Sequence, residues 1–275
     1  MKLVLLMFFF FYSILCIAAT TETEMETKKP MLKNINDFSS ELSKNRILAK
    51  QYRQRGVIFS HRYQLEQALS DFDNAISLWP TYVTAIIDKA VVLSKMQNYQ
   101  EALAVLDEAE RINPDDSYIF RERGNINFFL EKYEDATKDF EKYLSIDSNS
   151  VYRGIWLFLA QSHIDAKLGQ EKLAKYSAAF KSSEWPWPII ELYLGKQDIS
   201  SLLKSLKDKE KQMSPGEVCE AYFYIAQWFL LKNDIGKAIF YFESSLATEA
   251  SDFLEFQYSA LTLKRIKDDA SIKIH

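Results

Sequence analysis

Two consecutive stretches of equal length decide the fold. Residues 49–82 read AKQYRQRGVIFSHRYQLEQALSDFDNAISLWPTY, and residues 83–116 read VTAIIDKAVVLSKMQNYQEALAVLDEAERINPDD. On a shared 34-residue grid, small or apolar residues recur at positions 4, 8, 11, 20, 24 and 27, and proline recurs at position 32. These are Tyr52, Gly56, Phe59, Ala68, Phe72, Ala75 and Pro80, then Ile86, Ala90, Leu93, Ala102, Leu106, Ala109 and Pro114. Repetition at one fixed interval predicts a stack of similar units.

Further units follow with more departures. A third unit starts at Ser117 and keeps Phe120, Gly124, Ala136 and Phe140, but it loses the pattern at Asn127, Tyr143 and Ser148. A two-residue shift recovers a fourth unit from Arg153, with Trp156, Leu159, Ala160, Tyr176 and Ala179. A later unit from Cys219 has Tyr222, Ile225, Ala226, Phe229, Ala238 and Phe242. The starts at 153 and 219 lie about two repeat lengths apart, which indicates a worn repeat between them.

Each recurring residue type has a packing role. Small residues at positions 8 and 20 let the two helices of a unit cross closely, and the aromatic at position 24 fills the space beside that crossing. Proline at position 32 ends the second helix. The pattern resembles the tetratricopeptide (TPR) family, and the resemblance implies an all-α fold of helix-turn-helix repeats stacked into a right-handed superhelical solenoid. Position 7, usually Leu in that family, is Arg55, Lys89 and Arg123 here.

The chain divides into four parts. Residues 1–19 combine Lys2, an apolar run over residues 3–17 and two alanines, which predicts a signal peptide. An uncleaved membrane anchor is the alternative, and a lipidated Cys16 is a third reading that the large Leu15 weakens. Residues 20–36 are predicted to be a flexible linker, and residues 37–186 N-terminal TPR repeats with a leading helix. Residues 187–275 are predicted to be a C-terminal helical region with a degenerate repeat, one clear TPR at 219–252 and a capping helix over residues 253–266.

Local signals place the elements of the C-terminal region. Prolines at 186 and 188 exclude a continuous helix there, and Gly195 is expected to close a short helix over residues 189–194. Asp198 is expected to cap an amphipathic helix that ends near Gln212. Ser214 and Glu217 form a predicted capping box at the start of the next helix.

Composition and motifs argue against catalysis. The net charge of −4 provides no field that would attract nucleic acid. His61 and His163 fall in separate units and His275 lies at the chain end, so we expect no catalytic residues, no metal site and no cofactor. The carboxylate pairs fit solvated helix faces. An enzyme in the irregular region 181–215, with Glu184 and Glu191, is the least favoured alternative.

The TPR resemblance implies a concave groove lined by positions 2, 5, 9 and 12 of each first helix. The predicted partner-binding residues are Lys50, Arg53, Ile87, Val91, Tyr118, Arg121, Asn125 and Phe128. Some TPR proteins clamp a peptide carboxylate with Lys, Asn and Arg, and Arg53 matches one such position, but Val57 replaces the asparagine. Arg121 and Asn125 both carry donors that suit a peptide backbone or carboxylate.

A narrower resemblance concerns the C-terminal half. The strings EWPWPIIELYLG (residues 184–195) and CEAYFYIAQ (residues 219–227) are similar to NlpI-type TPR proteins of Gram-negative bacteria. That resemblance implies an exported adaptor in the periplasm or cell envelope that docks proteases or peptidoglycan-remodelling enzymes, often as a homodimer. We therefore expect protein or peptide partners, no nucleic acid, and membrane contact only through an uncleaved or lipidated N-terminus. A component of a secretion or pilus assembly apparatus is the alternative.

Overall fold

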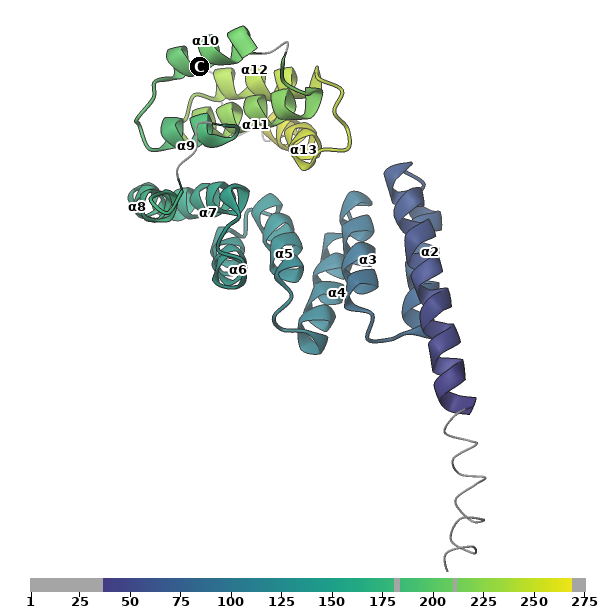
Figure 1. Ribbon diagram of the computed structural model, residues 1–275. Helices are drawn as coiled ribbons and strands as arrows, with labels where there is room; N and C mark the ends of the chain where they lie inside the picture. The colour runs from purple at the N-terminus through teal and green to yellow at the C-terminus, as the bar shows by residue number, and fades with distance from the viewer. Residues whose placement is uncertain (1–36, 181–183, 210–211, 269–275) are drawn as a thin grey trace, which may run out of the picture.

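The described part of the chain is helical. The computed structural model describes residues 37–180, 184–209 and 212–268, so the predicted signal peptide and linker lie outside the described residues. A first helix covers residues 37–61. It is followed by α2 (Leu65–Leu78), α3 (Val83–Lys95), α4 (Tyr99–Ile112), α5 (Ser117–Phe129), α6 (Tyr133–Ile146), α7 (Val151–Ile164), α8 (Ala166–Ser177), α9 (Trp187–Tyr193), α10 (Ile199–Lys209), α11 (Pro215–Leu231), α12 (Ile235–Leu246) and α13 (Leu254–Asp268) (Figure 1). The predicted all-α class and pairwise helix packing are confirmed.

Helix starts follow the repeat interval closely. Helices α3, α5 and α7 start at Val83, Ser117 and Val151, which are 34 residues apart. The two-residue shift that we placed before the fourth unit is therefore wrong for its first helix. The shift lies in the turn, because only Asp165 separates α7 from α8, whereas residues 96–98 separate α3 from α4.

The predicted close crossings of paired helices are present. A Cβ atom at Gly56 would lie 2.8 Å from the Phe72 ring, and one at Gly124 would lie 2.6 Å from the Phe140 ring. In the fourth unit the residue that meets Tyr176 is Gly154 rather than the expected Ala160, with a Cβ distance of 2.5 Å. Glycine thus lets the first helix of these units rest directly on an aromatic ring of the second.

The turns inside successive units share one backbone conformation. Tyr63, Gln97 and Glu131 lie 34 residues apart and have φ angles of 56°, 64° and 60°. The next backbone N–H in each turn donates to a carbonyl five residues earlier, as Asn98 does to Leu93 at 2.9 Å. This is the Schellman arrangement, which ends a helix by satisfying its last carbonyl groups.

The C-terminal helices contain the locally predicted features. Gly195 has a φ of +68° after α9, Asp198 accepts from the Ser201 N–H at 3.0 Å, and Ser214 and Glu217 form the capping box of α11. Helix α13 lies along α12 and α11 where a capping helix was predicted. Figure 1 shows that α9–α13 turn back over the earlier repeats, so that α13 faces the concave side of the arch.

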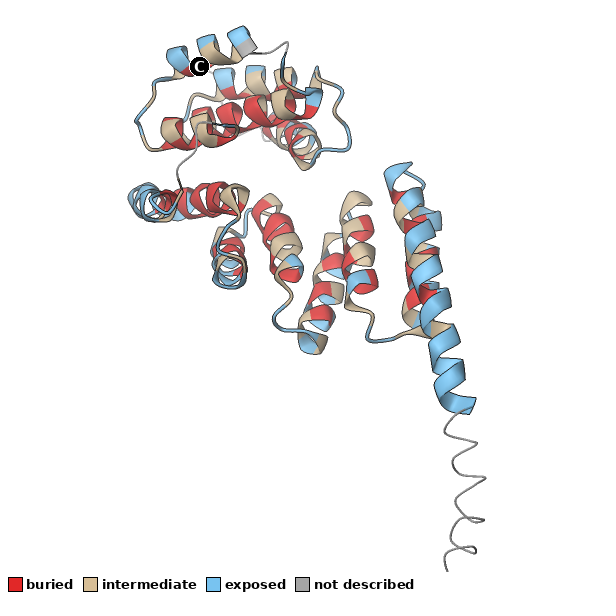
Figure 2. Cartoon of the chain, viewed as in Figure 1, coloured by how far each residue is buried: buried red, intermediate tan, exposed pale blue. Residues whose placement is uncertain are grey.

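Burial differs strongly along the stack. Figure 2 shows buried residues concentrated on α7 and α11 and exposed residues at the start of the first helix. The largest core cluster joins side chains from α5 through α13, with Trp156 fully buried at its centre. Residues 37–47, which we expected to cover the first repeat, continue without a break into its first helix, and Phe38, Leu42 and Ile47 are 59–68% exposed.

Candidate functional site

The largest described cavity on the concave side lies where α13 returns over α3 and α5. Its volume is about 560 Å³, and we call it the groove cavity. Three elements of the first half and two of the second form most of its wall, which consists of Val91, Ser94, Lys95, Arg121, Glu122, Asn125, Ile126, Tyr143, Ser150, Tyr152, Arg153, Glu220, Asp252, Leu254, Glu255, Gln257 and Tyr258. The site therefore combines residues that are far apart in the sequence.

Three predicted groove residues, Val91, Arg121 and Asn125, line this cavity. The Arg121 guanidinium forms an ion pair with Glu122 at 2.7 Å and lies 4.4 Å from the centre of the Tyr118 ring. The buried Asn125 accepts a hydrogen bond through Oδ1 from Arg153 Nη1 at 2.8 Å. Arg121 thus stands at the half-exposed side of the cavity, whereas Asn125 belongs to its floor.

The other predicted groove residues lie outside the cavity wall. Lys50 is exposed, and Arg53 Nε lies 2.6 Å from Asp88 Oδ2. Ile87 is buried, and Tyr118 is exposed beside Arg121. Phe128 is buried with its ring centre 5.2 Å from that of Trp156. The concave surface therefore continues from the cavity toward the first helix through Arg53 and Lys50.

The floor of the cavity is a buried polar network from three helices. Arg153 of α7 lies 5.8 Å from the ring centres of both Phe140 and Trp156. Glu220 of α11 accepts from Trp185 Nε1 at 2.8 Å and from Tyr152 Oη at 3.1 Å. Sequence reasoning missed these residues, because Arg153 and Glu220 meet only when the C-terminal helices fold back.

Burial sets the protonation behaviour of the floor. It raises the pKa of Glu255 to about 7, and the nearby Glu220 carboxylate adds to that rise. Glu255 accepts a hydrogen bond from Tyr224 Oη at 3.0 Å, which partly opposes the shift. Burial also raises the pKa of Glu220 and lowers that of Arg153. The floor is thus close to neutral and is held together mainly by hydrogen bonds.

Lys95 provides the polar group with the weakest satisfaction at the cavity wall. Its Nζ atom lies 3.4 Å from Ser60 Oγ and 5.6 Å from the centre of the Tyr63 ring. Among the described residues, no carboxylate lies within ion-pair distance of this amine. Burial lowers the pKa of Lys95, so an anionic or carbonyl group of a ligand would satisfy it.

Comparison with known families assigns the repeats. One tetratricopeptide repeat model matches residues 61–121, and a second tetratricopeptide repeat model matches residues 122–150. The chain is a TPR protein. The matched residues include α3 and α5, so the TPR units supply two walls of the groove cavity.

Solved TPR structures are similar to this TPR chain at low sequence identity. A thermophilic TPR protein of Thermus thermophilus is 13% identical, with a TM-score of 0.48, over 78% of this chain and 99% of that one. YrrB, described as a TPR protein with an unusual peptide-binding site, is 16% identical over 82% of this chain and 97% of that one, with a TM-score of 0.44. The first TPR of Spaghetti (RPAP3), bound to an HSP90 peptide, is 18% identical over 49% of this chain and 96% of that one, with a TM-score of 0.38.

The cations at TPR position 7 now have a structural explanation. Arg55 pairs with Asp71 at 2.7 Å and Arg123 pairs with Asp139 at 2.8 Å, in both cases 16 residues later on the second helix of the same unit. Arg123 also pairs with Asp107 at 2.8 Å, 16 residues earlier on the preceding unit. The usual leucine contact between helices is thus replaced by ion pairs within and between TPR units.

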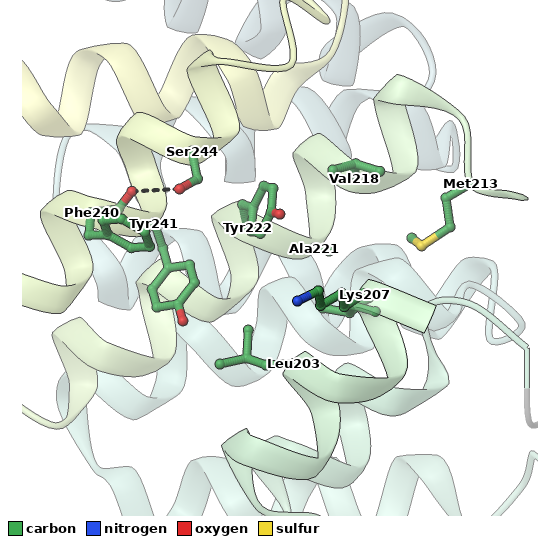
Figure 3. Close-up of a pocket in the computed structure, with 10 residues that line it drawn as sticks. Leu203, Lys207, Met213, Val218, Ala221, Tyr222, Phe240, Tyr241 and Ser244 are labelled. Carbon is green, nitrogen blue, oxygen red and sulfur yellow. Dashed lines mark hydrogen bonds between the residues drawn. The ribbon is translucent and has the colours of Figure 1, made fainter. Parts of the chain in front are cut away.

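A second, more apolar cavity of about 300 Å³ lies between α10, α11 and α12 (Figure 3). Leu203 and Tyr222 face each other across it, and Lys207 stands at its edge. Ser244 Oγ donates to the Phe240 carbonyl at 2.9 Å. This cavity contains no set of side chains that resembles a catalytic centre, and neither Glu184 nor Glu191 lines it or the groove cavity.

The described residues provide no metal-binding group. No three His, Cys, Asp or Glu side chains among them lie close enough together to hold an ion. His163 stacks on Tyr133 with ring centres 4.1 Å apart, and burial lowers its pKa. Over the same part of the chain, no helix combines the length and apolar character needed to cross a bilayer.

Proposed function

We propose that this TPR protein is an adaptor that holds an extended segment of another protein in the groove cavity and along the concave surface beside it. The observation that carries this proposal is the groove cavity itself, which offers both donors and acceptors on an open concave wall. Lys95 and Arg121 supply donors, while Glu122 and Asp252 supply acceptors.

Such a mixed wall suits a polypeptide. An extended peptide presents N–H and C=O groups that must both find partners when they leave water. Val91 and Ile126 add apolar contact area between the charged residues. The cavity is also larger than a single side chain requires, and it continues into the surface near Arg53.

We further propose that the adaptor works in the bacterial cell envelope. The support is the apolar run over residues 3–17 with its alanine exit, together with the similarity of residues 184–195 and 219–227 to NlpI-type proteins. Proteases or peptidoglycan-remodelling enzymes are the partners this reading favours. Capture by cross-linking in intact cells, followed by mass spectrometry, tests it, and exclusive recovery of secretion or pilus assembly components would support the alternative instead.

Arg121→Glu tests the groove directly. Peptides of twelve residues are first selected from a displayed random library on the wild-type chain, and their affinities are measured by calorimetry. We expect the Arg121→Glu variant to bind the selected peptides at least about tenfold more weakly, because a charge-assisted donor becomes a repulsive acceptor. Helix content in circular dichroism should not change, since the side chain is half-exposed.

Arg111→Glu is the matched control, because Arg111 is exposed in the last turn of α4. It should retain the wild-type affinity. Equal affinities for both variants and the wild type would reject the groove as the binding site. Failure of the selection to produce any peptide that competes with another would count against peptide binding itself.

A further inference from the structure

Helix α13 covers part of the concave surface that a partner would use. Tyr258 Oη donates to the Asn125 carbonyl of α5 at 2.8 Å. Two helical turns later, Arg265 Nη2 donates to the Phe129 carbonyl at 2.6 Å, and Arg265 Nη1 pairs with Glu131 at 2.5 Å. We call Asn125, Phe129 and Glu131 the α5 docking surface.

The α5 docking surface has a defined chemistry. Its polar groups in these contacts are two carbonyl oxygens and one carboxylate, so all of them accept hydrogen bonds. The Phe129 ring lies between the two donors, 5.4 Å from the Tyr258 ring and 4.9 Å from the Arg265 guanidinium. Residues 258 and 265 lie on the same face of α13 because they are seven positions apart. The surface therefore fits a helix that carries a phenol and a guanidinium at this spacing.

The contact between α13 and α5 is sparse compared with the other contacts of α13. Leu263 and Ile266 are buried in the core cluster shared with α11 and α12, and α13 lies along α12 over much of its length. In contrast, the ends of side chains make its contact with α5. Helix α13 therefore belongs to the C-terminal unit and touches α5 as a separate body would.

Unfilled space borders this contact on both sides. The groove cavity extends along Leu254, Glu255 and Tyr258, and another cavity of about 300 Å³ is lined by Phe129, Glu131, His163, Tyr258 and Arg265. Side chains beside a cavity lose dispersion contacts that a close-packed interior would supply. Separation of α13 from α5 thus costs a few specific interactions rather than a continuous core.

We propose that α13 is a built-in occupant of the α5 docking surface, and that a partner helix with a phenol and a guanidinium seven residues apart displaces it. This inference rests on the proposed function, since it assumes that partners use the concave side. Displacement joins the groove cavity to the surface beneath α13 and lengthens the groove from α3 to α7. The isolated chain is then a partly closed adaptor.

Distance measurements between spin labels test the occupant without any partner. Labels are attached to Gln100→Cys on α4 and Lys204→Cys on α10, both exposed, in a chain that also carries Cys16→Ser, with the native Cys219 fully buried. We expect one narrow distance distribution for the otherwise unchanged chain. Arg265→Glu should add a population at longer distance, because the new carboxylate repels Glu131 and loses the Phe129 carbonyl.

Two further variants make the result specific. Lys264→Glu introduces the same charge change at the neighbouring exposed position and should retain the narrow distribution. Glu131→Arg should open the molecule as Arg265→Glu does, and the double variant Glu131→Arg/Arg265→Glu should recover the closed distance. A single distribution common to all of these variants would overturn the proposal, as would opening that the double variant does not reverse.

The partner chemistry is tested with a synthetic peptide of residues 253–268. We expect it to bind the Arg265→Glu chain at least about tenfold more tightly than the unchanged chain, because its own occupant is weakened there. A peptide with Arg265→Glu should bind neither chain. Equal binding of the two peptides would reject the proposed donor pair. The proposed function is judged separately, by the effect of Arg121→Glu on library peptides.

Discussion

At the residue scale, a glycine beside an aromatic ring sets how closely the paired helices approach. Gly124 is the tighter of the two regular crossings, with space for no side chain between α5 and the Phe140 ring. The sequence pattern predicted this role correctly for Gly56 and Gly124. It failed for Ala160, because the shortened turn after α7 changed which residue of that helix meets Tyr176.

Gly124→Ala should therefore destabilise the protein. An added Cβ atom would lie 2.6 Å from Phe140, so the helices must separate, and we expect a loss of about 1–3 kcal/mol in the free energy of unfolding. Gly236→Ala on α12 is the control, because nothing lies within 4 Å of its added Cβ atom. There alanine should be neutral or stabilising by up to about 1 kcal/mol. Urea titrations measure both, and equal effects would contradict this account.

The ion pairs of Arg123 are a second residue-scale feature. Position 7 departs from the TPR pattern, and the compensating carboxylates 16 residues away could have been found in the sequence only by searching for that spacing. Asp139, the closest of them, also accepts from Asn127 Nδ2 at 3.0 Å and is almost fully buried. The pair is therefore part of the interface between two helices.

Replacement of Arg123 by methionine should leave the buried Asp139 carboxylate without its cation. We expect a loss of about 3 kcal/mol, and we expect Arg123→Met/Asp139→Asn to recover part of it. Lys138→Met removes the pair with Asp135, in which both side chains are largely exposed, and should change stability by less than about 0.5 kcal/mol. Thermal unfolding at neutral pH compares the three variants, and a neutral Arg123→Met would show that the carboxylate is solvated.

At the element scale, the turns between paired helices use a conformation that the sequence conceals. Tyr63, Gln97 and Glu131 adopt positive φ angles without being glycine or asparagine. Standard turn signals therefore do not mark these positions, although their 34-residue interval is as regular as that of the apolar residues. The interval arises because each first helix has the same length and must end before the second can pack.

Two glutamines on either side of such a turn give a matched test. Gln97 has a φ of 64°, so Gln97→Gly relieves a strained conformation and should stabilise the protein by up to about 1 kcal/mol. Gln100 is an exposed residue inside α4, so Gln100→Gly should cost about 0.5–1 kcal/mol. Midpoints of denaturant unfolding should shift in opposite directions. A shift in the same direction would mean that Gln97 is not strained.

At the scale of the whole molecule, repeat stacking was predictable and the return of α13 was not. Stacking depends on neighbours within one or two units, and local spacing encodes it. The hydrogen bond from Tyr258 to Asn125 joins residues 133 positions apart, and no periodic pattern reports such a contact. The same reason explains why Val91, Arg121 and Asn125 were predicted, whereas Glu220 and Glu255 on the opposite wall were missed.

The junction between the two halves should weaken as pH rises. The pKa of Glu255 is about 7 in the folded chain and near its ordinary value of 4.5 when unfolded, so the folded form binds the proton more tightly. Arg153 from α7 and Glu220 and Tyr224 from α11 face this carboxyl. Its contribution to stability is unaffected below pH 4.5 and falls through pH 7, by up to about 3 kcal/mol in all.

Glu255→Gln removes this titration while keeping an acceptor for Tyr224. Relative to the wild type, the variant should gain stability between pH 4.5 and pH 7 and keep a constant advantage above that range. Glu108→Gln, at an exposed position of α4, should follow the wild type at every pH. Calorimetric midpoints across this range measure the difference. A wild type and a Glu255→Gln chain with parallel pH profiles would show that this carboxyl is ionised in the folded protein.

The contact between α13 and α5 also restricts how this architecture can grow. An open solenoid can acquire an extra unit anywhere, since each unit recognises only its neighbours. Here, a unit duplicated between α5 and α13 would carry Tyr258 and Arg265 away from Asn125 and Phe129. Duplication ahead of α5 would leave both links in place. Lengthening of this chain by gene duplication is therefore compatible with the closed form only on the N-terminal side.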